Sequence, residues 1–294
     1  MWSYSLYNLV MENSGTPTTP AVATAVPATA AAPPATAAPA APVEFTGKKI
    51  FFLYPTVAVE NKVITELVQQ EYEVYIAKNK DTIRRVLRDH HGSIVFVDIN
   101  EQMKETEWEA WITAVKNAQD TKDTAIGIVT SNDDEQIKRK YLLTIKVCGY
   151  TVLKFDLDKA VMHLIEVLQA LDAKGRRKFL RATTTKDSNV TLNLPYNGKF
   201  INGNIRDISV VGISCTLDGN PEIPKNTLIK DIQVKLQSSI IKIEGIVFGT
   251  RSEGEGYETN YVLLFTQRID PEVRTKIRKY IQHNLQSKMD NELK

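Results

Sequence analysis

The basic stretch GRRKFLRAT holds the residues whose type and spacing best suit the binding of an anion. Arg177 and Arg181 lie four positions apart in it, and Arg176 adds a third guanidinium group. Each guanidinium is a planar fork that can donate two parallel hydrogen bonds to a phosphate or to another planar acceptor. Basic runs are usually solvated surface, so the rest of the sequence decides between a hinge and a binding site.

A second polar motif, DxSxxG, follows 26 residues after Arg181 and consists of Asp207, Ser209 and Gly212. The carboxylate can accept hydrogen bonds from the N–H donors of a ligand, and the hydroxyl can bond a neighbouring polar atom. The glycine lets the backbone come close to a ligand. The same residues could instead form an ordinary Asp-initiated turn in which Gly212 has a positive φ.

The net charge of +2 is unevenly distributed along the 294 residues. Residues 48–174 hold 18 Lys and Arg against 20 Asp and Glu, whereas residues 175–294 hold 19 against 13. The C-terminal part is therefore the better candidate for an anionic partner. A nucleic acid is the weaker choice of partner, because neither an aromatic stacking pattern nor a recognition-helix motif accompanies the charge.

The first of these two regions alternates short apolar runs with segments of helical periodicity. The runs that predict strands are 48–54, 73–77, 93–99, 124–130 and 151–156. A helical pattern follows each run, and the last one ends near Gly175. Five strand–helix units in a row indicate a parallel sheet with helices on both faces, which is an α/β domain.

The second region is rich in β-branched residues in alternating runs, separated by turn sequences such as NG, DG and GN. These runs are 190–194, 199–208, 212–217, 229–236, 239–248 and 261–265. They predict an all-β barrel or sandwich. The closing helix begins after Asp270, and its apolar stripe is expected to lie on the barrel. The stripe consists of Val273, Ile277, Ile281 and Leu285.

The N-terminal part has a different composition. Residues 16–43 consist of Ala, Pro, Thr and Val alone and include seven prolines, so they cannot form a packed core. Such a segment favours an extended polyproline conformation and could reach about 90 Å. The preceding WSYSLYNLV lacks the pattern of a signal peptide, and we expect a docking peptide or an upstream extension of a start at Met11.

Three polar residues at the ends of predicted strands resemble those of the response-regulator receiver family, which has a (βα)₅ fold. Asp98 ends the third strand, Thr130 the fourth and Lys154 the fifth. The resemblance implies that they correspond to the phosphoacceptor, the hydroxyl switch and the lysine of that family. They fall at the C-terminal edge of a parallel sheet, where such folds place their chemistry.

Three departures from the receiver pattern argue against phosphorylation. Tyr54 and Pro55 stand where the family has the acidic pair that holds Mg²⁺, and Phe155 replaces the proline after the lysine. A single carboxylate is a poor Mg²⁺ site, and phosphoryl transfer needs the metal. We therefore predict a pseudo-receiver, in which Asp98 is retained for structural or dimerisation reasons.

The order RxxxR and then DxSxxG, at the entrance of a β-rich region, resembles the PilZ family. The resemblance covers residues 175–288 and includes GIVFGTR and YVLLF as closing strands. It implies a six-stranded β-barrel that binds cyclic di-GMP. By this resemblance, the ligand-binding residues are Arg177, Arg181, Asp207, Ser209 and Gly212, with Arg176 as an additional arginine.

The sequence thus predicts an α/β domain followed by an all-β domain. The expected parts are a disordered N-terminus and linker (1–46), a receiver-like domain (47–174), a PilZ domain with a C-terminal helix (175–288) and a tail (289–294). Cys148 and Cys215 lie in apolar runs, which suits a reducing cytoplasm. We expect no membrane span, because no apolar stretch approaches about 20 residues.

These features predict a cytoplasmic cyclic di-GMP effector and not an enzyme. Ligand binding would change the interdomain arrangement and thereby regulate motility, adhesion or another surface behaviour through a downstream protein partner. We expect no cofactor and no bound metal, since the four histidines lack metal-ligand spacing and no catalytic grouping is visible. The alternative is a phosphorylation-responsive regulator that signals through Asp98.

Overall fold

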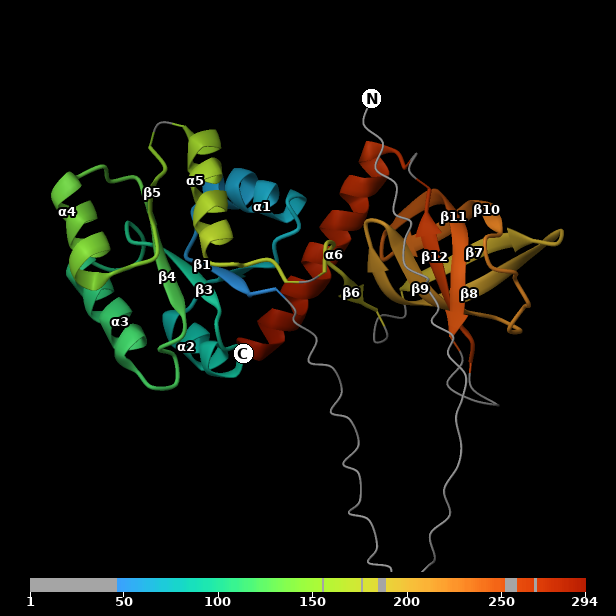
Figure 1. The fold of residues 1–294 in the computed structure, drawn as a ribbon, viewed down its shortest axis with the longest axis horizontal. Helices are drawn as coiled ribbons and strands as arrows, with labels where there is room; N and C mark the ends of the chain where they lie inside the picture. The colour runs from blue at the N-terminus through green and yellow to red at the C-terminus, as the bar shows by residue number, and fades with distance from the viewer. Residues whose placement is uncertain (1–46, 155, 176, 185–188, 252–257, 267–268) are drawn as a thin grey trace, which may run out of the picture. The chain divides into compact units, whose positions relative to one another are not determined.

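The structure is a computed structural model, shown in Figure 1. It describes residues 47–294 except 155, 176, 185–188, 252–257 and 267–268. The predictions for the N-terminal extension, Arg176 and Phe155 therefore lie outside the described residues. Residues from Glu44 to Lys294 group into one compact unit, in which an α/β domain precedes a β-barrel.

The α/β domain is built on a five-stranded parallel sheet with the order β2-β1-β3-β4-β5. This is the doubly wound order of flavodoxin-like folds, which receiver domains share. The sequence prediction of a receiver-like fold is thus confirmed. The strands are β1 (Ile50–Leu53), β2 (Val74–Ala77), β3 (Ile94–Asp98), β4 (Ala125–Thr130) and β5 (Tyr150–Val152).

Helices cover both faces of this sheet. Along β1, Phe51 belongs to the apolar cluster on one face, whereas Phe52 belongs to the cluster on the other face. The first cluster includes α2 and α3, and the second includes α1 and α5 (Figure 1). The helical segments are η1 (Val59–Ile64), α1 (Thr65–Gln69), α2 (Lys80–Asp89), α3 (Glu105–Asn117), α4 (Glu135–Arg139), η2 (Lys140–Ile145) and α5 (Leu157–Ala170).

The second domain is a closed antiparallel barrel of six strands. The strand order is β8-β7-β10-β11-β12-β9, and the pairing of β9 with β8 closes it, while the short β6 adds to β8. This confirms the predicted barrel. The strands are β6 (Ala182–Thr183), β7 (Val190–Tyr196), β8 (Lys199–Ser209), β9 (Gly212–Leu217), β10 (Leu228–Leu236), β11 (Ser239–Arg251) and β12 (Asn260–Phe265).

The last helix, α6 (Pro271–Glu292), packs against both domains. Asp270 caps it by accepting from the Glu272 amide at 2.7 Å. Ile277 and Ile281 are buried in the barrel cluster, as the predicted stripe required, whereas Met289 is buried in a cluster of the receiver-like domain. The helix therefore continues through the residues that the sequence analysis separates as a tail. No helix in the described part of the chain has the length and apolarity to cross a membrane.

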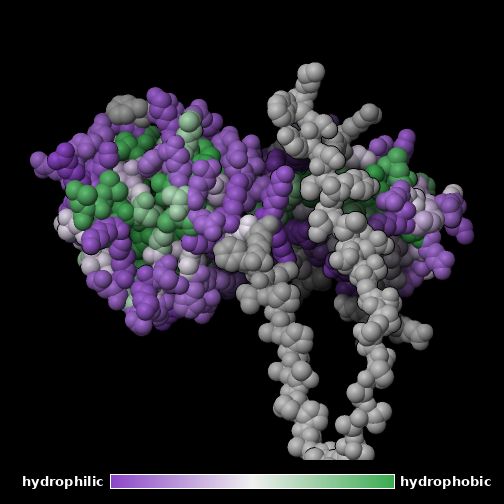
Figure 2. Space-filling view, viewed as in Figure 1, coloured by the Kyte–Doolittle hydropathy of each residue, from purple (hydrophilic) through white to green (hydrophobic). Residues whose placement is uncertain are grey.

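Hydrophobic side chains also reach the surface of the barrel (Figure 2). Leu228, Ile246 and Leu264 form a row across three neighbouring strands, because β10, β11 and β12 pair in that register. All three are exposed, and Phe248 lies two residues beyond Ile246 with Lys225 Nζ at 5.4 Å from its ring centroid.

Candidate functional site

The pairing of β6 with β8 brings the two predicted motifs together. Ala182 pairs with Ile208, and Thr183 pairs with Asp207. Arg181 directly precedes β6, so this pairing places it beside the end of β8 that carries Asp207 and Ser209. A two-residue strand therefore sets the position of one motif relative to the other.

Arg181 and Asp207 face each other at this junction. Arg181 Nη1 lies 3.9 Å from Asp207 Oδ1, and the two side chains are 52% and 33% exposed. Arg177 is also exposed. An ion pair this open and this long contributes little to stability, so both groups retain donors and acceptors that a ligand can use.

Ser209 and Gly212 are buried and shape the turn between β8 and β9. The Ser209 hydroxyl donates to the Gly212 carbonyl at 3.2 Å and accepts from the Val211 amide at 3.4 Å. Gly212 is not among the residues with positive φ, so the alternative of an αL glycine in a simple turn does not apply. A Cβ at Gly212 would lie 2.6 Å from the Leu263 carbonyl oxygen. The glycine thus permits the close approach of β12.

A residue of the receiver-like domain contacts the arginine segment, which we define as residues 177–181. Glu71 Oε2 accepts from the Leu180 amide at 3.0 Å, and Glu71 Oε1 accepts from Arg278 Nε and Nη2 at 3.2 and 3.0 Å. The Glu71 side chain is 11% exposed. Sequence analysis missed Glu71, because nothing in its local sequence indicates a partner 109 positions away.

The cavity beside the arginine segment is small. It measures about 70 Å³ and is lined by Glu71, Tyr72, Arg177 and Arg181 among others. Sites that enclose an organic ligand usually measure about 300–1,000 Å³. This cavity is therefore too small to enclose an organic ligand.

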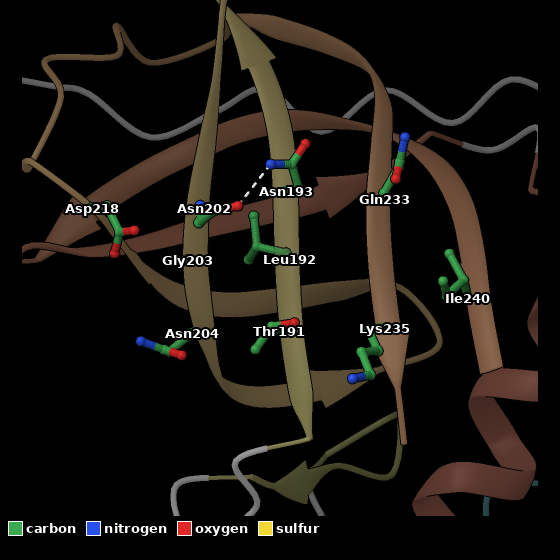
Figure 3. Close-up of a pocket in the computed structure, with 10 residues that line it drawn as sticks. All are labelled: Thr191, Leu192, Asn193, Asn202, Gly203, Asn204, Asp218, Gln233, Lys235 and Ile240. Carbon is green, nitrogen blue, oxygen red and sulfur yellow. Dashed lines mark hydrogen bonds between the residues drawn. The ribbon is translucent and has the colours of Figure 1, made fainter. Parts of the chain in front are cut away.

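A larger hollow, of about 260 Å³, lies on the outer face of the barrel (Figure 3). Its floor consists of side chains from β7, β8 and β10, and Asn193 Nδ2 donates to Asn202 Oδ1 at 2.8 Å across it. Neutral amides dominate this surface, and its charged members, Asp218 and Lys235, lie at opposite ends of it (Figure 3). None of the predicted ligand-binding residues lines it, and its charge does not suit an anion with two phosphates.

Two of the three receiver-like positions, Asp98 and Thr130, meet at the C-terminal edge of the parallel sheet. Asp98, which is 2% exposed, ends β3 and accepts from the Asn100 amide at 3.1 Å. Asn100 Oδ1 in turn accepts from the Thr130 hydroxyl at 2.6 Å. Burial raises the pKa of Asp98 to about 6, because the charged carboxylate loses its hydration. Asp98 and Thr130 are thus linked through Asn100.

Lys154, the third receiver-like position, forms an ion pair with an acid of the β4–α4 loop. It lies two residues beyond the end of β5, and its Nζ donates to Asp133 Oδ1 and Oδ2 at 3.3 and 3.2 Å. The ion pair with Asp133 draws the ammonium toward the β4–α4 loop. The correspondence of Lys154 to the lysine of the receiver family stays a prediction.

The residues at this edge do not fit a bound Mg²⁺. Tyr54 follows β1 in place of a carboxylate, and its ring packs edge-on against Trp108 at 6.0 Å between centroids. Among the described residues, no group of three or more His, Cys, Asp and Glu side chains could hold a metal ion. Mg²⁺ requires near-octahedral oxygen ligands, which Asp98 alone cannot supply.

Comparison with known proteins gives one family match in sequence and several matches in fold. A family model described as the PilZ domain matches residues 175–283. A comparison with curated proteins found no match.

Similar solved structures include the PilZ domain with c-di-GMP of YcgR from Escherichia coli, at 11% identity and a TM-score of 0.34, covering 40% of this chain and 95% of that one. The K. pneumonia MrkH-c-di-GMP complex is 19% identical with a TM-score of 0.34, covering 39% of this chain and 55% of the other. The chain thus spans about half the length of MrkH.

The α/β domain also has relatives in fold. Chemotaxis response regulator CheY4 of Vibrio cholerae is 19% identical with a TM-score of 0.35, covering 42% of this chain and 100% of that one. The family match and the six-stranded closure together lead to one conclusion: residues 175–283 are a PilZ domain that follows a receiver-like domain.

Proposed function

We propose that the protein is an effector of cyclic di-GMP and that its PilZ domain binds this ligand at the junction of the arginine segment and the β8–β9 turn. The observation that carries the proposal is the exposed pairing of Arg181 with Asp207 within a PilZ domain. Both halves of the site are accessible, and Arg177 lies exposed in the same segment.

The chemistry of the ligand suits these groups. Cyclic di-GMP carries two phosphates and two guanines, so it offers anionic oxygens and the O6/N7 acceptor edge to the forks of Arg177 and Arg181. Asp207 can accept from the guanine N1 and N2 donors. Ser209 and Gly212 would act through the turn that holds β8 and β9, since both are buried. Arg176 remains an additional proposed ligand contact.

The output of binding is a change in how the arginine segment and the receiver-like domain are held together. The segment is bonded to that domain through Glu71, so a ligand that engages the arginines acts directly on this contact. We propose that the resulting change regulates motility, adhesion or another surface behaviour through a protein partner. The receiver-like domain would serve as a pseudo-receiver, because the residues after β1 cannot supply metal ligands.

Calorimetric titration of the purified chain with cyclic di-GMP tests the site. Arg177→Ala and Arg181→Ala should each weaken binding by about 1.5–3 kcal/mol, the usual effect of losing a charge-assisted hydrogen bond. Lysine at either position should not restore affinity, since an ammonium group lacks the planar fork.

Arg88→Ala is a matched control, because Arg88 is 50% exposed and pairs with Asp120 at 2.6 Å in the receiver-like domain. It should bind like the wild type. Wild-type affinity in both Arg177→Ala and Arg181→Ala would show that the ligand binds elsewhere.

A further inference from the structure

We infer that Glu71, on the receiver-like domain, is a positioning residue for the PilZ ligand site. Its carboxylate fixes the backbone between Arg177 and Arg181 and so holds the two guanidinium groups ready for the ligand. The inference rests on the proposed function for the identity of the ligand. It assigns a role in binding to a domain that carries none of the predicted ligand contacts.

Glu71 has a backbone conformation that usually favours glycine. Glu71 has φ 64, in the left-handed region, and follows Gln70, the C-cap residue of α1. Its amide donates to the Val68 carbonyl at 3.0 Å, and the Tyr72 amide donates to the Leu67 carbonyl at 3.1 Å. This bonding pattern ends a helix in the Schellman arrangement, where glycine is the usual residue. A glutamate adopts that conformation at a cost that glycine avoids.

The carboxylate of Glu71 uses both oxygens to connect separate segments. Oε2 accepts from the Leu180 amide, while Oε1 accepts twice from the Arg278 guanidinium on α6. Arg278 supplies the positive charge that a carboxylate with 11% exposure requires. The Leu180 amide therefore has a charged, nearly buried acceptor, which makes this hydrogen bond stronger than an exposed one.

The arginine segment is thus held on two sides. Phe179 and Leu180 pack against the apolar cluster of the barrel, and the Leu180 amide is bonded to Glu71. The neighbouring Arg177 and Arg181 remain exposed. A segment whose backbone is already ordered does not lose that freedom when the ligand binds, so its affinity is higher than that of a loose segment.

The coupling must also work in the opposite direction. If the contact through Glu71 strengthens ligand binding, the ligand strengthens the contact by the same factor. Cyclic di-GMP would therefore tighten the link between the PilZ domain and the receiver-like domain. The ligand would thereby influence how the receiver-like domain is held, although it does not contact that domain.

Three variants of the full chain test this role. Glu71→Gly removes the carboxylate and also relieves the left-handed backbone, so the variant is expected to fold. Glu71→Gln keeps one carbonyl acceptor for the Leu180 amide and should restore part of the effect. Glu73→Gln is the matched control, because Glu73 lies in the same turn region and its carboxylate bonds Lys49 at 2.6 Å.

Two readouts apply to each variant: hydrogen exchange of the Leu180 amide by NMR, and the Kd for cyclic di-GMP. In Glu71→Gly the amide should exchange at least about tenfold faster, and the Kd should rise about tenfold, as expected when roughly one residue of backbone must be ordered on binding. Glu71→Gln should fall between Glu71→Gly and the wild type, and Glu73→Gln should match the wild type in both readouts.

Unchanged exchange of the Leu180 amide in Glu71→Gly would overturn the inference, as would an unchanged or lower Kd in a protein that binds the ligand. If the wild type does not bind cyclic di-GMP, the proposed function fails. The exchange measurement then still decides whether Glu71 orders the arginine segment, so the two failures can be told apart.

Discussion

Replacing Asp98 with asparagine should stabilise the protein at neutral and alkaline pH. Burial raises the pKa of Asp98 to about 6, well above the usual range of an aspartate, and the hydrogen bond from the Asn100 amide offsets this only in part. The folded state therefore binds a proton that the unfolded state releases. The stability linked to this proton is fully present below about pH 4 and is lost as the pH rises through about 6. Two pKa units correspond to about 3 kcal/mol.

The Asp98→Asn variant keeps the side-chain oxygen that accepts from the Asn100 amide but cannot ionise. Urea unfolding at several values from pH 4 to pH 8, followed by tryptophan fluorescence, measures the difference between variant and wild type. Trp108 and Trp111 lie in the receiver-like domain, so the signal reports on the relevant domain. The advantage of the variant at pH 8 should exceed that at pH 4 by about 2–3 kcal/mol. A difference that does not change with pH would refute the assignment of a raised pKa to Asp98.

Gly212→Ala should lower the free energy of unfolding by about 1–3 kcal/mol, because its Cβ would lie 2.6 Å from the Leu263 carbonyl; wild-type stability in chemical denaturation would contradict the close approach. Burial raises the pKa values of Cys148 and Cys215 to about 11 and about 12, so neither thiol should react quickly with a disulfide reagent at pH 8 before unfolding. Asp98 should not take up phosphate from a small phosphodonor in the presence of Mg²⁺. Phosphate labelling of the wild type that is lost in Asp98→Ala would instead favour the response-regulator alternative.

Most of the fold follows from local patterns in the sequence. The five apolar runs each end where a helical pattern begins, which is enough to predict the parallel sheet. The capping of α6 by Asp270 and its contact with the barrel through Ile277 and Ile281 were also readable, since both depend on spacing within one helix. Each of these features depends on residues that lie close together in the sequence, so the sequence pattern predicts it.

The arrangement of the site depends on contacts that no local pattern encodes. The order of the two motifs indicated a site, but the β6–β8 register, which pairs Thr183 with Asp207 and so brings Arg181 near that carboxylate, is a pairing between distant segments. Glu71 is an acidic residue after a short helix, and its contact with Leu180 becomes visible only once both domains are folded. The ion pair of Lys154 with Asp133 is another contact that the strand pattern does not reveal.

Equilibrium titration of the full chain with cyclic di-GMP, in parallel with the linear dinucleotide and with GTP, tests the central claim most directly. The wild type should bind the cyclic ligand saturably and in preference to the other two. The double variant Arg177→Ala, Arg181→Ala should lose at least about a hundredfold in affinity, as expected when two charge-assisted contacts are removed. Absence of saturable binding by the wild type, or equal binding by the double variant, would contradict the assignment of this PilZ domain as a cyclic di-GMP receptor.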